Sequence, residues 1–209
     1  MRMQLKIELI PERAFGANLR RTMSRQGWDT LRKTIYKLYG YCCAVCGGKG
    51  PRHPVECHEV WRFRLKTATQ TLVGLEALCP MCHAVKHYGR SALLGNDERV
   101  KDLHAWLAAV NDMTRKQVIK YIDTCFHIWS LKSNGVDRWK IEYQYLRDFA
   151  AQHIMCSGAG SLNPRGAQNA CKPSIDIPAD GYAVGKACKR TSHTDFEEDD
   201  GDFEGFYFF

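Results

Sequence analysis

Two cysteine pairs of the form Cys-x-x-Cys constrain this chain more than any other feature. The first pair is Cys43 and Cys46, and the second is Cys79 and Cys82. Thiolates are anionic ligands that bind zinc tightly, and two such pairs supply the four tetrahedral ligands of a closed structural site. The sequence therefore predicts one structural Zn²⁺ held by these four cysteines.

Three histidines lie near these pairs but outside the predicted zinc shell. His83 follows the second pair directly and His87 comes four residues later, so that on a helix both lie on one face, one turn apart. His58 lies in residues 54–61, where valines and a tryptophan are typical of a strand. We therefore expect a second, more open site for a divalent ion, with His58 facing the helical histidines across a hairpin.

The remaining pattern predicts an α+β fold. In residues 61–65, Arg alternates with apolar side chains, as in a strand with one buried face, and the apolar run 72–78 is typical of a buried return strand. Helical periodicity and capping residues predict helices over 28–38, 97–110 and 114–133, and alternation predicts further strands over 3–10 and 139–145.

Over residues 28–87 the sequence resembles the HNH endonucleases, above all their zinc-knuckle branch, and a weaker similarity to bacterial and phage HNH proteins covers residues 3–149. The resemblance rests on Cys43-Ala-Val-Cys46, Glu56-Cys57-His58-Glu59 and Cys79-Pro-Met-Cys82-His83-Ala-Val-Lys-His87. It implies the ββα-metal fold, in which a two-stranded hairpin packs against a helix around one catalytic divalent ion. It also implies that His58 is the general base and that His83 and His87 bind the ion.

Two positions depart from the HNH pattern. Cys57 stands where family members commonly carry an Asp or His that binds the metal, and Gly74 stands where the middle Asn of the name is usual. Cys57 is accordingly a candidate ligand of the catalytic ion. Glu56, Glu59 and Gln70 are candidate auxiliary groups that could supply the missing oxygen or amide.

The resemblance implies a metal-dependent endonuclease that hydrolyses DNA phosphodiester bonds, with Mg²⁺, Mn²⁺, Ni²⁺ or Zn²⁺ as the catalytic ion. The alternative is a catalytically silent, zinc-dependent module of HNH fold that binds nucleic acid or protein. The departures at positions 57 and 74 favour the alternative. The three histidines favour the enzyme, because a pure scaffold needs none of them.

The charge of the chain is unevenly distributed. The formal charge is +7, but residues 195–209 contain seven acids and no Lys or Arg, so residues 1–194 carry +14. A body this basic suits a polyanion such as DNA, because neutralised phosphates release condensed counterions. The candidate phosphate contacts are Arg62, Arg64, Lys66 and Lys86. Solvent-facing strand positions are also often Arg in proteins that bind no DNA.

Composition and pattern divide the chain into five segments. They are an N-terminal strand, basic connector and helix (1–40), the zinc-knuckle HNH core (41–90), a helical extension with a short strand (91–155), a disordered linker (156–194) and an acidic aromatic tail (195–209). The tail either binds a protein partner or only aids solubility. Because neither a signal-peptide core nor an apolar run of roughly 20 residues occurs, we expect a cytoplasmic protein without membrane contact.

Overall fold

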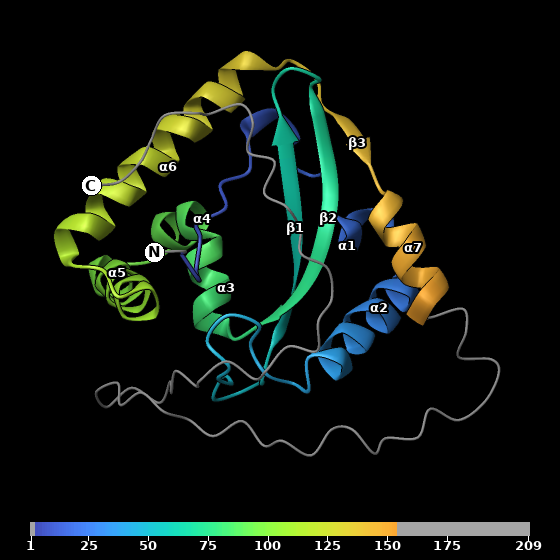
Figure 1. The fold of residues 1–209 in the computed structure, drawn as a ribbon, viewed down its shortest axis with the longest axis horizontal. Coiled ribbons are helices and arrows are strands. Elements are labelled where there is room, and N and C mark those ends of the chain that lie inside the picture. Colours follow the sequence, from blue (N-terminus) through green and yellow to red (C-terminus); the bar gives the residue numbers. More distant parts are fainter. Residues whose placement is uncertain (1–2, 154–209) are drawn as a thin grey trace.

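A long antiparallel hairpin forms the centre of the computed structural model, which describes residues 3–153 (Figure 1). Its strands are β1 (Glu56–Arg64) and β2 (Thr69–Leu78), and β3 (Lys140–Glu142) pairs in parallel with the start of β2. The helices are the 3-10 helix η1 (Glu12–Ala14), α1 (Leu19–Thr22), α2 (Arg25–Leu38), α3 (Pro80–Lys86), α4 (Tyr88–Leu93), α5 (Asp97–Asn111), α6 (Arg115–Gly135) and α7 (Gln144–His153). The predicted α+β class is confirmed for this part of the chain.

A bulge in the hairpin keeps apolar side chains on one face. Val60 pairs with Gly74, whereas Trp61 pairs with Leu72, so β2 has one residue more than β1 at this point. Such a bulge reverses the alternation of side chains along the strand that carries it. Leu72 and Leu75 consequently contact the same core from opposite sides of the bulge.

The hairpin separates two groups of helices. Figure 1 shows α3, α4, α5 and α6 on one side and α1, α2 and α7 on the other. The core on the first side includes Leu78, Val85, Leu103 and Leu107, and the core on the second side includes Leu31, Ile35, Leu75 and Phe149. Because helices cover both faces of the hairpin, polar side chains of its strands are also shielded from water.

Residues 3–10 form no strand, and a bend lies at residues 4 and 5, so the predicted strand is wrong. Leu5 and Ile7 are buried, as the alternation predicts. Their backbone N–H groups donate to side chains and not to a neighbouring strand: that of Leu5 to Asn111 Oδ1 at 2.9 Å and that of Ile7 to Tyr121 Oη at 3.0 Å. Alternation reports which side chains are buried, whereas the partner of the backbone depends on what packs beside it.

Capping residues set the starts of the predicted helices. Asn96 accepts a hydrogen bond from the N–H of Arg99 at the start of α5, and Thr114 and Gln117 form the predicted capping box of α6. Both helices are confirmed. Helix α2 begins three residues earlier than predicted, because the Ser24 side chain caps it.

The chain beyond α6 is more helical than the alternation of aromatic residues predicts. Of the predicted strand 139–145, only β3 forms, and α7 begins at Gln144. Tyr145 and Phe149, one helical turn apart, stack with their ring centroids 6.1 Å apart. The aromatic side chains therefore pack by helical spacing in α7.

Two further expectations concern membrane contact and the C-terminal residues 156–209. Within residues 3–153, no helix combines the length and the apolar character needed to cross a bilayer. The predicted linker (156–194) and the acidic aromatic tail (195–209), with its predicted protein partner, lie outside the described residues.

Candidate metal centres

The four cysteines of the two predicted pairs lie together. Cys43 and Cys46 precede β1, Cys79 is the N-cap of α3, and Cys82 lies in the first turn of that helix. Their sulfur atoms are all within 4.8 Å of one another, and Sγ of Cys46 lies 3.7 Å from Sγ of Cys79. Zn–S bonds of about 2.3 Å in a tetrahedron place sulfurs about 3.8 Å apart. The cluster is therefore compatible with a structural metal site.

Backbone and side-chain N–H groups point at these sulfurs. Gly47 has φ 70°, a left-handed conformation that favours glycine, and this turn lets the N–H of Gly48 donate to Cys46 Sγ at 3.4 Å. From α5, Trp106 Nε1 donates to Cys82 Sγ at 3.2 Å. Donors of this kind stabilise negative charge on sulfur, which a metal-binding thiolate carries.

The thiol pKa values show how charge is shared within the cluster. Hydrogen bonds from Cys46, Cys79 and Cys82 lower the pKa of Cys43 far below its ordinary value. Hydrogen bonds with Cys43 and Cys46 raise the pKa of Cys79 and of Cys82 well above theirs. One thiolate therefore forms at the expense of the others, and a cation among the sulfurs is what allows all four to ionise.

The three predicted histidines form a second cluster at the other end of α3. His83 lies on α3, His87 is its C-cap, and His58 approaches from β1. One ring nitrogen from each lies within 4.8 Å of the others, and the ring centroid of His58 is 5.3 Å from that of His83 and 4.9 Å from that of His87. His58 is 2% exposed, whereas the two helical histidines are half-buried and give solvent access to the cluster.

Carboxylates orient two of the three rings. Glu8 Oε2 lies 2.8 Å from His58 Nε2, and Glu56 Oε2 contacts His83 Nδ1. The other ring nitrogen of His58, Nδ1, is buried and has no hydrogen-bond partner. Metal-binding histidines commonly donate their second ring N–H to a carboxylate in this way. His83 therefore keeps its second ring nitrogen for an ion, and His58 keeps Nδ1 free beside it, so the residues fit a bound metal.

Burial and neighbouring charges set the pKa values at this cluster. Burial raises the pKa of Glu8, but the hydrogen bond from His58 and the charges of His58 and Lys86 outweigh it and lower the pKa to about 2. Burial, reinforced by the neighbouring histidines, lowers the pKa of His87 to about 3. At neutral pH the His87 ring is therefore uncharged, which is the form that binds metal.

Lys86 is buried, which contradicts its predicted contact with DNA. Its Nζ lies 2.5 Å from Glu8 Oε1 and 3.2 Å from Glu76 Oε2. Burial lowers the pKa of Lys86, but the two carboxylates outweigh burial and raise it, so the ammonium stays charged. Together with Glu56, these groups carry a formal charge of −2 around three imidazole rings, which a divalent ion would balance.

Cys57 lies on the opposite face of β1 from His58, so its predicted role as a ligand of the catalytic ion is wrong. Successive side chains of a strand point to opposite faces, and Cys57 directly precedes His58. The Cys57 thiol packs in the core on the α2 side, where burial raises its pKa to about 12. The thiol therefore lies away from the three histidines and is not part of their cluster.

Of the three auxiliary candidates, only Glu56 lies at the histidine cluster. Glu59 accepts a hydrogen bond at 3.0 Å from the N–H of Leu19, the first residue of α1, on the far face of the hairpin. Gln70 lies near the hairpin turn, opposite a residue five positions beyond His58 on β1. Five residues of strand span about 17 Å, so Gln70 cannot reach the cluster.

The predicted DNA-contact residues of the hairpin lie toward its turn. Arg62 is half-buried, whereas Arg64 and Lys66 are exposed. Arg64 is six residues from His58, about 20 Å along the strand. These cations therefore form no part of the histidine cluster, and their contact with DNA stays a prediction.

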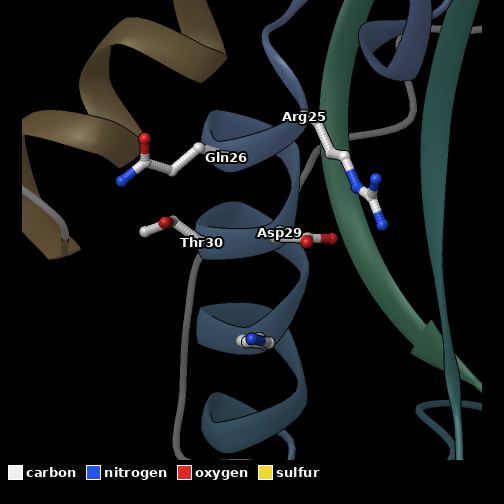
Figure 2. A pocket seen from close by; sticks show the side chains of 5 residues that line it. Arg25, Gln26, Asp29 and Thr30 are labelled. Atoms are coloured by element: carbon white, nitrogen blue, oxygen red, sulfur yellow. The ribbon is translucent and has the colours of Figure 1, made fainter.

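A shallow depression on α2 lies apart from both clusters. Figure 2 shows that its lining residues all come from this one helix, and they are Arg25, Gln26, Asp29, Thr30 and Lys33. Asp29 is occupied by an ion pair with Arg32 of the same helix at 2.8 Å. Because α2 lies across the hairpin from α3 (Figure 1), the depression does not open onto the histidines.

The carboxylates Glu8 and Glu76 were not identified from the sequence. Glu76 stands directly opposite His58 in the hairpin, which only the register reveals. Glu8 occupies the polar position between two apolar residues of the N-terminal segment, where alternation predicts exposure to solvent. No spacing rule connects residue 8 with residue 58.

The fold and the two clusters together define a class of protein. It is an α+β protein in which a hairpin and the helix that follows it bring together four buried cysteines and three histidines. No family model, curated protein or solved structure matches the chain.

Proposed function

We propose that this chain is a metal-dependent endonuclease of HNH type that hydrolyses phosphodiester bonds of DNA. The observation that carries the proposal is the convergence of His58, His83 and His87 at the junction of β1 and α3, beside a four-cysteine cluster. The cysteine cluster holds a structural Zn²⁺ in this proposal. The order of hairpin, second cysteine pair and histidine-bearing helix supports the resemblance to the ββα-metal arrangement.

His83 and His87 hold the catalytic ion in this proposal, and His58 is the general base. An ion held by these two histidines would supply Lewis-acid polarisation of the phosphate and stabilisation of charge on the leaving 3′-oxygen. His58 takes a proton from water at Nδ1, the ring nitrogen that is left without a partner. Glu56 holds His83 in the orientation in which its other nitrogen faces the cluster.

The nitrogen-rich ligand set indicates which ions the site accepts. Mg²⁺ prefers oxygen ligands, whereas imidazoles suit Zn²⁺, Ni²⁺ and Co²⁺. Position 74, where the resemblance places an Asn, is a glycine whose added Cβ would meet only the Val60 side chain at 3.6 Å. Position 57 faces the other core. We therefore expect cleavage with Ni²⁺, Co²⁺ or Zn²⁺ to exceed cleavage with Mg²⁺ or Mn²⁺.

The experiment that tests the proposal is cleavage of supercoiled plasmid by purified protein under each of these ions. His58→Ala should lower the rate by about 10²–10⁴-fold, the usual contribution of a general base, with zinc content and DNA affinity unchanged. A wild-type protein that is inert with all five ions on duplex and single-stranded DNA would refute the proposal. It would favour the silent zinc-dependent binding module instead.

A further inference from the structure

Glu8 connects the N-terminal segment to His58 through one contact and to Lys86 of α3 through two. Its Oε2 lies 2.8 Å from His58 Nε2, and its Oε1 accepts a hydrogen bond from Lys86 Nζ at 2.5 Å. Its backbone N–H donates to the carbonyl oxygen of Lys86 at 2.8 Å. Backbone and side chain are thus both anchored to the end of α3, which fixes the carboxylate beside the His58 ring.

The Glu8 contact determines which nitrogen of His58 carries the proton. An ionised carboxylate only accepts hydrogen bonds, so Nε2 of His58 must be the donor. Nδ1 is buried and has no acceptor, so a proton placed there would be left unsatisfied. The neutral ring therefore carries its proton on Nε2 and presents the Nδ1 lone pair toward His83 and His87.

We propose that Glu8 is a positioning residue that holds His58 in this tautomer and stabilises the imidazolium formed during catalysis. The proposal deepens the nuclease assignment and rests on it. When water attacks phosphorus, a new P–O bond forms, the bond to the 3′-oxygen breaks and that oxygen takes a proton from solvent. The proton of the attacking water moves to His58 Nδ1, and the resulting positive charge faces a carboxylate that keeps its own charge. The Glu8 side chain contacts His58 and Lys86, and it acts on the reaction only through His58. The site is consequently incomplete without the N-terminal segment.

The competing account is that Glu8 only neutralises the buried ammonium of Lys86. In that account, replacing Lys86 would make Glu8 dispensable, and the ring of His58 would not respond to Glu8. The two accounts differ at the Nε2 proton of His58, because only the positioning role depends on an acceptor there. A measurement on that proton separates them without any DNA substrate.

The test uses the full chain with its zinc bound and compares the wild type with Glu8→Ala, Glu8→Gln and the control Glu12→Ala. Glu12 is an exposed acid on the same N-terminal segment, so its replacement matches the change in charge. Nitrogen-15 NMR of the His58 ring should show a proton on Nε2, shifted downfield by its acceptor, in the wild type and the control. The shift should be reduced in Glu8→Gln and lost in Glu8→Ala.

Cleavage kinetics supply the second measurement. Glu8→Ala should lower kcat by about 100-fold or more with KM within about threefold, because the base is misoriented while phosphate binding is retained. The kcat of Glu8→Gln should be about 10-fold higher than that of Glu8→Ala, since the amide oxygen of Gln still accepts the hydrogen bond but carries no charge. Glu12→Ala should match the wild type.

The outcomes keep the two proposals apart. A wild-type ring protonated on Nδ1, or an Nε2 resonance unchanged in both Glu8 variants, would overturn the positioning role even in an active nuclease. The expected NMR result in a protein that cuts no DNA would keep the Glu8–His58 coupling and refute the nuclease. If Glu8→Ala does not fold, the test rests on Glu8→Gln, which preserves the shape of the side chain and one acceptor. The His58 Nε2 resonance of that variant then decides between the two accounts.

Discussion

Replacing Cys79 with serine tests the cysteine cluster and changes little else. Cys79 is fully buried, and its sulfur accepts a hydrogen bond from the N–H of Cys82 as the N-cap of α3. Serine is among the best N-cap residues, so Cys79→Ser keeps the helix start while it removes a soft, anionic ligand. Any large loss of stability in this variant therefore reports the metal and not the helix cap.

The expected magnitude follows from where the cluster lies. All four cysteines belong to the core between α3, α5 and α6, beside Leu78 and Val85. Structural zinc sites contribute about 10–16 kcal/mol of apparent binding free energy, which rivals the 5–15 kcal/mol that stabilises a typical domain. We expect Cys79→Ser to lower the free energy of unfolding by about 5 kcal/mol or more and to unfold residues 41–87 at ambient temperature.

The assay is chemical denaturation in reducing buffer, followed by circular dichroism, together with elemental analysis after desalting. The wild type should hold about one zinc per chain, and the variant much less. Cys125→Ser is the matched control, because Cys125 is a half-buried thiol packed against the same core but outside the cluster. The control should lose only about 1 kcal/mol. A zinc-free wild type with the stability of the zinc-bound protein would refute the reasoning.

Three further predictions follow from the histidine cluster and its surroundings. His83→Ala should raise the ion concentration needed for half-maximal cleavage, and more metal should restore part of its cleavage activity. More metal should not restore the activity of His58→Ala. Equal restoration of both variants in a metal titration would make His58 a third ligand. Lys86→Met should cost about 3–5 kcal/mol in urea denaturation, because two half-buried carboxylates lose their buried cation, while DNA affinity in a gel-shift assay stays unchanged. Cys57→Asp should destabilise the protein without changing its metal preference, because the new carboxylate would lie in the core beside Leu31; a shift toward Mg²⁺ in the cleavage assay would contradict this placement.

The parts of the fold that sequence predicts well are those set by local chemistry. Local neighbours within a few positions determine the spacing of the cysteine pairs, the strand-forming residues of 54–61, the alternation along 61–65 and the capping by Asn96 and Thr114. Each therefore predicts a cluster, a strand or a helix start that the structure confirms. The proximity of His58 to the helical histidines was predicted in the same way, from a hairpin followed by a helix.

The errors concern contacts between distant segments. A lysine is a typical DNA contact, but Lys86 lies on a face of α3 that points inward against Glu8. The position of Glu8 depends in turn on the N-terminal segment, which hydrogen bonds to Asn111 and Tyr121 hold in place. Cys57 was assigned by analogy of position, and the pleat of β1 directs it away. Local pattern carries no information about either arrangement, because both are fixed by packing across the hairpin.

Helix α3 has seven residues, and it is shared by both ligand clusters. Cys82 and His83 are neighbours in sequence, yet one belongs to the cysteine cluster and the other to the histidine cluster. A helix this short is not stable in water without its tertiary contacts, so the cysteine cluster at its start helps to place His83 and His87. If the chain is the proposed nuclease, binding of zinc by the cysteines would favour loading of the second ion. A cell short of zinc would then make protein with less cleavage activity.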